Sequence, residues 1–154
     1  MCDTHRRMFV QLATQLIREG KKDKALKVLD YCEKVIPNTT VPHDYIMSSS
    51  KEMAEDYMAL GQPAKAERIL TLLAQNATEY LQWYLSLDDG RLSGSYQECM
   101  RYFYILDDVC KSLDKLKDPK TQKPVQAAMK YGAQFDQLYK AFGQRAGMPT
   151  QHAE

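Results

Sequence analysis

The stretch LIREGKKDKALKVLD, residues 16–30, decides how the first part of the chain folds. Two apolar segments flank a short polar break, which is either a phosphate-binding loop or the corner between two helices. A phosphate loop of the form G-x-x-x-x-G-K-[ST] lies between a strand and a helix. Here Gly20 has no glycine five residues before it, and Lys21 is followed by Lys22 instead of Ser or Thr. The break is therefore predicted to be a helix corner, and its lysines are interpreted as solvated charge.

Apolar residues before and after this corner recur at helical spacing. They predict an amphipathic helix over 6–19 and a second helix over about 23–36. Gly20 favours the end of the first helix because it tolerates left-handed backbone angles, and Pro37 closes the second helix. The apolar stripe of the first helix consists of Phe9, Leu12, Ala13, Leu16 and Ile17. Two helices joined by so short a break are predicted to pack antiparallel.

The same pattern returns at an offset of 41 residues, which indicates an internal repeat. A helix is predicted over 43–61, and a second helix is predicted over 63–75 that runs on through Tyr80, Trp83, Tyr84 and Leu87. The aligned pairs are Gly20 and Gly61, Leu12 and Met53, Ala13 and Ala54, Leu16 and Tyr57, Ala25 and Ala66, and Leu29 and Leu70.

The second half of the chain is less regular. Its predicted elements are a loop over 88–95, a helix over about 95–117, a polar break over 118–124 and a last helix that ends at about 143. Residues 1–79 are expected to hold two helix pairs, and 80–154 a C-terminal helical extension that packs on them as a cap to give a single compact unit. The predicted fold class is all-α, with about six helices in antiparallel pairs and no sheet. The residues expected to be buried between helices are Leu12, Ala13, Ala25, Leu29, Ala54, Ala66 and Leu70.

The first unit resembles a tetratricopeptide repeat (TPR). The pattern that carries the resemblance is Phe9-x2-Leu12-Ala13-x2-Leu16-x3-Gly20-x4-Ala25-x3-Leu29-x2-Cys32-x4-Pro37. The second unit matches more loosely, with Ser50 in place of the first large residue and Thr78 in place of the proline. The period exceeds the usual value of about 34 residues, because the loop PNTTVPH (37–43) is longer. The resemblance implies TPR-like antiparallel helix pairs and a non-catalytic protein-interaction or scaffold role.

A narrower resemblance covers residues 3–90. The segments LIREGKKDKALKVLDYCEKVIPN, VPHDYIM, AEDYMALGQPAKAERIL and YLQWYLSL are similar to the soluble C-terminal region of a family of large bacterial multi-spanning membrane proteins of glycosyltransferase type. This similarity implies that the chain is an accessory soluble region of a membrane-anchored parent, and that any catalysis lies in an absent membrane part. Two alternatives stay open: a regulatory part of a membrane glycosyltransferase, and a small enzyme or helical ligand-binding domain.

Charge and hydropathy narrow the classes of partner. Twenty-one Lys and Arg oppose twenty Asp and Glu, so the formal net charge of +1 gives no overall attraction to nucleic acid. The start of the chain lacks the apolar region of a signal peptide. The most apolar long segment, 70–87, contains Gln75, Asn76, Glu79 and Gln82 and is better explained as a helix outside the membrane. We expect a soluble domain without direct membrane insertion.

The sequence predicts no catalytic residue, no metal and no cofactor. The cysteines form no C-x-x-C pair and have no histidine at zinc-finger spacing. No Ser or Cys is placed with a histidine to suggest a nucleophile–base pair. The residues considered are Cys2, Cys32, Cys99, Cys110, His5, His43 and His152. The expected partner is therefore a protein or peptide.

The TPR resemblance implies that a partner binds the concave face, which the first helix of each unit lines. The residues it selects are Arg7, Val10, Thr14, Ile17, Arg18, Ser48, Lys51, Glu55 and Met58. Some TPR domains hold a terminal carboxylate with a Lys and an Asn, but Val10 and Thr14 stand at those positions, so that clamp is expected to be absent. The face suits a helix or an extended segment with an apolar anchor and an acidic residue. The alternative surface is aromatic and lies around Trp83.

Overall fold

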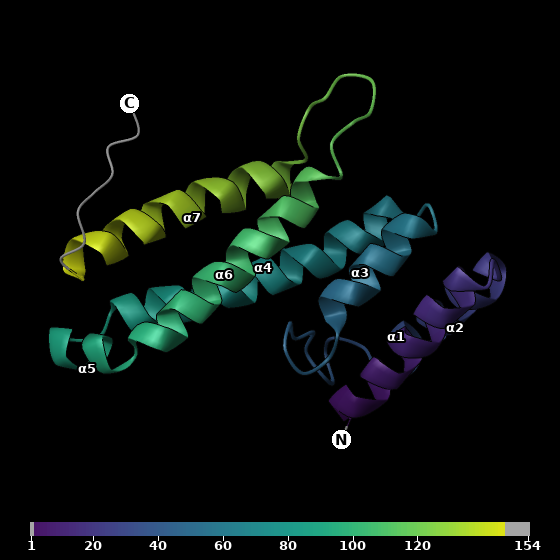
Figure 1. The fold of residues 1–154 in the computed structure, drawn as a ribbon, viewed down its shortest axis with the longest axis horizontal. Coiled ribbons are helices and arrows are strands. Elements are labelled where there is room, and N and C mark those ends of the chain that lie inside the picture. The colour runs from purple at the N-terminus through teal and green to yellow at the C-terminus, as the bar shows by residue number, and fades with distance from the viewer. Residues whose placement is uncertain (1, 147–154) are drawn as a thin grey trace. The chain divides into compact units, whose positions relative to one another are not determined.

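The computed structural model describes residues 2–146, and the regular secondary structure in that range is α-helical, without strands (Figure 1). The helices are α1 (Cys2–Arg18), α2 (Lys22–Val35), α3 (Ser50–Ala59), α4 (Pro63–Leu85), α5 (Asp89–Gly94), α6 (Tyr96–Asp114) and α7 (Gln126–Arg145). The prediction of an all-α fold is thereby confirmed.

Two predicted boundaries are wrong, and local hydrogen bonds explain both. The helix expected from 43 begins only at Ser50, because the Asp44 carboxylate accepts backbone N–H bonds from Ile46 (2.8 Å) and Met47 (2.6 Å) and holds a turn there. The loop expected over 88–95 contains the short helix α5, whose N-cap Asp88 accepts a 2.9 Å bond from the Arg91 backbone N–H. This extra turn of helix raises the number of helices in the described range from the expected six to seven.

The chain divides into two compact units, residues 1–73 and 74–154. The division falls inside α4, six residues before the boundary that the repeat pattern suggested at 79. Each unit is therefore described by itself. The predicted packing of 80–154 on the first helix pairs stays a prediction.

The corner at Gly20 joins two antiparallel helices, α1 and α2, which pack along each other (Figure 1). Gly20 has φ of 77°, and Gly61 at the corner between α3 and α4 has φ of 72°. The N–H of Lys21 donates to the Leu16 carbonyl at 2.8 Å. At the second corner the N–H of Gln62 donates to the Tyr57 carbonyl at 2.9 Å. Both helix ends are thus closed by the same 6→1 backbone hydrogen bond of a Schellman motif, which requires a residue in the left-handed conformation.

The buried seam repeats in the same way. Six of the seven predicted seam residues are fully buried: Ala13, Ala25, Leu29, Ala54, Ala66 and Leu70. The prediction is wrong for Leu12, which is 50% exposed, whereas its repeat equivalent Met53 is fully buried. Leu12 lies about 100° around α1 from Ala13, on the flank that faces away from α3. The same position of the repeat is therefore exposed in the first pair and buried in the second.

The second unit has an aromatic core between α6 and α7, which pack antiparallel (Figure 1). Phe103 of α6 is buried, and its ring centroid lies 5.8 Å from Phe135, 5.3 Å from Tyr139 and 5.3 Å from Phe142 of α7. Such edge-to-face and tilted contacts add to the burial of apolar area. The buried residues of the C-terminal half of α4 in this unit are Ala74, Ala77, Thr78 and Leu81.

Candidate functional site

The residues selected for the concave face lie on α1 and α3 or just before α3, but they are not equally accessible. Val10 is only 2% exposed and Ser48 is fully buried, so neither side chain presents a contact surface. Ile17 and Met58 are half-buried, whereas Arg18 is exposed. Arg7 is half-buried and donates to the Met47 carbonyl at 2.7 Å. The accessible part of this face is therefore mainly polar.

Three further residues of the selected face make contacts within the first unit. The Thr14 hydroxyl lies 2.6 Å from Asp56 Oδ2 and 2.9 Å from the Val10 carbonyl, and so links α1 to α3. Burial raises the pKa of Asp56, and the hydrogen bond from Thr14 only partly opposes this shift. Lys51 and Glu55 form an ion pair of 2.9 Å one turn apart on α3.

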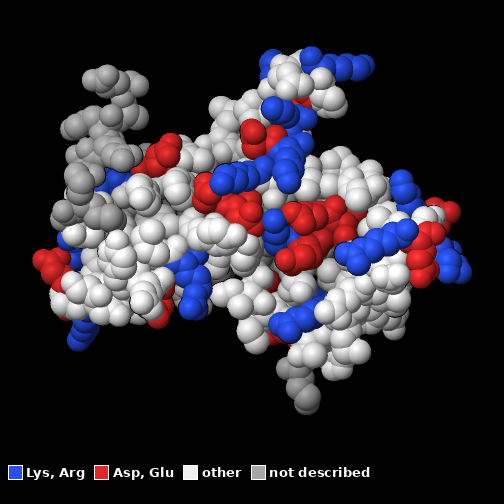
Figure 2. Space-filling model, in the orientation of Figure 1, with Lys and Arg blue, Asp and Glu red and all other residues white. Residues whose placement is uncertain are grey.

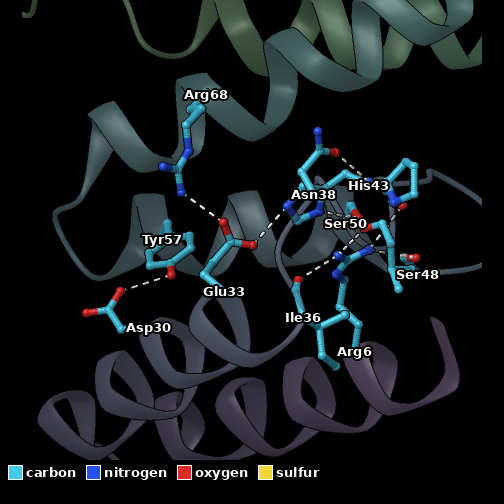
Figure 3. A network of polar contacts seen from close by, with 12 residues as sticks. Arg6, Asp30, Glu33, Ile36, Asn38, His43, Ser48, Ser50, Tyr57 and Arg68 are labelled. Carbon is cyan, nitrogen blue, oxygen red and sulfur yellow. Dashed lines mark hydrogen bonds and ion pairs between the residues drawn. The ribbon is translucent and has the colours of Figure 1, made fainter. Parts of the chain in front are cut away.

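The strongest polar feature of the first unit is a buried arginine, Arg6, which points from α1 into the loop between α2 and α3 (Figure 3). Its Nη1 donates to the Pro42 carbonyl and to Ser48 Oγ, both at 3.1 Å. Its Nη2 donates to the carbonyls of Ile36 at 2.9 Å and Val41 at 2.6 Å. One guanidinium group therefore satisfies three backbone carbonyls that no regular element pairs, which is what buried carbonyls require.

Sequence reasoning missed Arg6, although a signal was present. Arg6 falls on the same stripe of α1 as Val10, Ala13 and Ile17, at spacings of 4, 3 and 4 residues. A charged residue on a buried stripe is rarely fully buried unless it is paired. Arg6 on this stripe therefore indicates a buried polar contact, but the stripe does not identify the carbonyls that accept its bonds.

A second polar array lies beside Arg6 and contains a histidine between a serine and a carboxylate (Figure 3). His43 Nδ1 lies 2.8 Å from Ser50 Oγ, and His43 Nε2 lies 2.8 Å from Glu33 Oε1. The other oxygen of Glu33 accepts from Arg68 Nη2 at 2.8 Å. The expectation that no serine stands beside a histidine is thus wrong, because α3 begins at Ser50, seven residues after His43.

This array has the composition of a hydrolase triad but not its accessibility. Ser50 is fully buried and His43 is 3% exposed, so a substrate cannot reach the hydroxyl in this structure. Ser50 Oγ also accepts from the Asp44 backbone N–H at 3.2 Å, and the His43 backbone N–H donates to Asn38 Oδ1 at 2.9 Å. These bonds tie the start of α3 to the loop and to α2, so the array links three segments of the first unit.

The carboxylate of this array is ionised over a wide pH range. Burial acts to raise the pKa of Glu33, but the hydrogen bond from His43 and the charges of His43, Arg68 and Arg6 outweigh it. The net result is a pKa below the ordinary value. A charged Glu33 thus contributes to the stability of the first unit at neutral pH.

The three described thiols, Cys32, Cys99 and Cys110, are shielded from solvent to different extents. Cys32 and Cys99 are buried and Cys110 is half-buried, and none of the three is in a disulfide. Burial raises the pKa of Cys32 and of Cys110 to about 11, so both are protonated at neutral pH. Among the described residues, no three His, Cys, Asp or Glu side chains are grouped to hold a metal ion. The side chain of Cys2, and His152, lie outside the described residues.

The aromatic surface around Trp83 belongs to the second unit. Trp83 is 56% exposed and its ring lies 5.0 Å from that of Tyr84. Tyr80 of α4 stacks on Tyr102 of α6 at 4.6 Å, and Tyr84 contacts Tyr102 at 6.1 Å. These rings form a connected, partly exposed strip over two helices. It stays an alternative contact surface.

A small hollow lies in the second unit between α5, the start of α6 and the end of α7. Its volume is about 210 Å³. Arg145 lines it, but this guanidinium donates to the carbonyls of Leu85 and Leu87 and to Asp89 Oδ1 at 2.8 Å. Ligand pockets generally measure about 300–1,000 Å³. The hollow is thus small, and its charge is already paired.

Positive and negative side chains are interspersed over the face shown in Figure 2, without a large area of one sign. This agrees with the near-balance of 21 basic and 20 acidic residues. The lysines Lys117, Lys120 and Lys123 lie in the loop between α6 and α7, together with Asp118. Within residues 2–146, no helix combines the length and the hydropathy that a membrane crossing requires.

The comparisons with known proteins add no assignment to this geometry. No protein-family model matches the chain, and searches of curated proteins and of solved structures give no significant match. The resemblance to TPR domains and the resemblance to a membrane glycosyltransferase family therefore stay predictions from the residues.

Proposed function

We propose that this chain is a non-catalytic protein-interaction or scaffold domain. One observation carries the proposal. The repeated helix pairs bury Ser50, His43 and Cys32, whereas several large apolar side chains are exposed. In the first unit these exposed side chains are Met8, Leu12, Tyr31, Val35, Ile46 and Met47. Met8 and Leu12 lie one turn apart on α1, and Tyr31 and Val35 lie one turn apart on α2. Exposed apolar residues that adjoin one another mark contact surfaces.

The proposed arrangement of these pairs is TPR-like. Two corners with matching left-handed glycines and matching bonds support it, as do the small residues Ala13, Ala25, Ala54 and Ala66 at the seam. Small seam residues let helices approach closely. The lengthened connection between the pairs is compatible with this arrangement, because Arg6 holds it against α1.

The non-catalytic part of the proposal rests on accessibility. Ser50, whose hydroxyl lies 2.8 Å from His43 Nδ1, is fully buried. The pKa values of the described thiols are raised by burial, which disfavours the nucleophilic thiolate. A small ligand-binding domain is the weaker alternative, because the hollow at Arg145 is small and already paired.

The concave face is proposed to bind a helix or extended segment with an acidic residue, recognised by Arg7 and Arg18. The test is the double substitution Arg7→Glu with Arg18→Glu, assayed against a partner isolated by pulldown. We expect binding to fall steeply and its salt dependence to weaken. The matched control, Lys34→Glu with Lys140→Glu, makes the same change in net charge on exposed helix positions elsewhere. Unchanged binding at low salt, with the fold intact, moves the site to the strip around Trp83.

The chain is further proposed to be an accessory soluble region of a larger membrane protein, or the regulatory part of a membrane glycosyltransferase. The similarity over residues 3–90 supports this part. The test is the full reading frame of the gene. A hydrophobic region with several spans upstream of Met1 is the expected result, and a frame without one contradicts it.

A further inference from the structure

The flank of α1 and α2 that faces away from α3 is apolar and exposed. Leu12 of α1 is 50% exposed, and Tyr31 and Val35 of α2 are 56% and 46% exposed. The rings of Phe9 and Tyr31 meet edge to face at 5.8 Å, so the apolar residues of the two helices form one surface. We call this surface the open flank; its apolar residues are Phe9, Leu12, Leu16, Val28, Tyr31 and Val35.

The repeat shows what such a flank contacts when it is covered. At the offset of 41 residues, Leu12, Leu16 and Val28 correspond to Met53, Tyr57 and Ile69 of the second pair. These three equivalents are fully buried. The flank of the second pair is contacted by the first pair, as the bond of 3.0 Å from the Tyr57 hydroxyl to Asp30 Oδ1 shows.

The charges repeat together with the apolar stripe. Lys65 and Arg68 of α4 reach across to the preceding pair, where Lys65 Nζ lies 2.8 Å from Asp30 Oδ1 and Arg68 Nη2 lies 2.8 Å from Glu33 Oε2 (Figure 3 shows the second of these pairs). The equivalents of Lys65 and Arg68 on the open flank are Lys24 and Lys27, which are both exposed. Lys24 and Lys27 thus stand at the positions from which Lys65 and Arg68, in the second pair, bind two carboxylates three residues apart.

We propose that the open flank is a docking site for a helix pair of another protein that presents an apolar stripe flanked by two carboxylates at i and i+3 spacing. The complementary charge and the continuity with the interface between the two pairs argue for this occupant. A second copy of the chain does not supply it. Asp30 and Glu33 of a second copy are already bound to α4, and the residues 41 positions later are Thr71 and Ala74.

This inference goes beyond the proposed function, because it concerns a flank of α1 other than the one that holds Arg7 and Arg18. The two are separable in experiment. Substitution of Lys24 and Lys27 leaves a partner of the concave face bound, and substitution of Arg7 and Arg18 leaves the open flank unchanged.

The test supplies the missing acidic pair from the chain itself. A copy of residues 1–49, which keeps the hydrogen-bond acceptors of Arg6, is joined by a flexible Gly/Ser linker to the N-terminus of the full chain. In this copy Asp30 and Glu33 are uncovered. The full chain carries Leu12→Cys, and both copies carry Cys2→Ser. The readout is the rate at which a thiol reagent modifies position 12 of the full chain, measured by peptide mass spectrometry. We expect the added copy to slow the modification by about tenfold or more, because a short linker gives millimolar effective concentration.

Charge reversal then tests the acidic recognition. Lys24→Glu with Lys27→Glu should restore fast modification, and Asp30→Lys with Glu33→Lys in the added copy should rescue protection of that variant. The matched control, Lys120→Glu with Lys140→Glu, changes two exposed lysines of the second unit and should leave protection intact. This exchange of sign separates a specific contact from a general effect of net charge.

Three results overturn the proposal. The first is an unchanged rate at position 12, whether or not the added copy becomes helical by circular dichroism, since the flank then fails to dock a pair held beside it. The second is protection that does not depend on Lys24 and Lys27, which indicates apolar stacking without acidic selectivity. The third is protection in the unmodified chain that rises with its own concentration, which identifies a second copy as the occupant.

Discussion

Replacement of Arg6 by methionine should destabilise the first unit more than any surface substitution. Methionine keeps much of the apolar stem but removes the donors to Ile36, Val41, Pro42 and Ser48. Two of these four bonds, to Ser48 Oγ and the Ile36 carbonyl, are fully buried. A buried acceptor left without its donor costs about 1–3 kcal/mol, so the two together cost about 2–6 kcal/mol.

Part of this loss is offset, because a buried guanidinium is itself costly to desolvate. We therefore expect Arg6→Met to lower the free energy of unfolding by about 2–4 kcal/mol. Arg7→Met is the matched control. The neighbouring side chain donates one bond at the surface, to the Met47 carbonyl, and should change stability by less than about 1 kcal/mol.

The assay is urea unfolding followed by two probes. Far-ultraviolet circular dichroism reports helix in both units, whereas fluorescence of Trp83, the single tryptophan, reports the second unit. Arg6→Met should shift the circular dichroism transition of the first unit to lower urea. Hydrogen exchange of α1 and of the first turn of α3 should accelerate together. A midpoint equal to that of Arg7→Met refutes the reasoning, since the four bonds then contribute nothing to stability.

Other substitutions test other elements. Gly20→Ala should destabilise the fold by about 1–2 kcal/mol, because Gly20 has a left-handed φ of 77°. Gly132→Ala should instead stabilise it by about 0.5–1 kcal/mol, because Gly132 lies inside α7 with open space around the added Cβ. Urea midpoints measure both changes. Because the pKa of Glu33 is lowered in the folded state, its contribution to stability is present above its ordinary value of 4.5 and is lost as pH falls through the folded value. Urea midpoints from about pH 6 to about pH 3 should thus fall less steeply for Glu33→Gln than for the native chain. Ala25→Trp should overpack the fully buried seam of α1 and α2 and cost about 1–3 kcal/mol or more; an unchanged melting temperature contradicts that pairing. Thermal unfolding with and without a chelator should coincide, and a large drop with chelator shows that a metal site was missed.

The sequence was sufficient for those features that depend on neighbours in the chain. Gly20 and Gly61 mark the corners because a left-handed residue is needed within a few positions of a helix end. Ala13 and Ala25 mark the first seam because helical spacing identifies the face and side-chain size identifies the close approach. Both inferences use only local geometry.

The features that depend on partners distant in sequence were not predictable in the same way. The exposure of Leu12 follows from which flank of α1 meets α3, and its spacing alone does not report that. His43 and Ser50 come together because the turn at Asp44 replaces the expected helix, and this brings them to Glu33, ten residues before His43. The acceptors of Arg6 lie 30 to 42 positions away in the chain.

That last separation has a consequence for the order in which the chain is made. During synthesis Arg6 leaves the ribosome first, and its acceptors, which extend to Ser48, follow only later. Until then the nascent first pair carries an unpaired charge on the stripe that is to be buried, which is costly. The first pair therefore cannot reach its final packing by itself. Its completion waits for the connection to emerge as far as Ser48, so the first pair and the connection that follows it reach their final packing together.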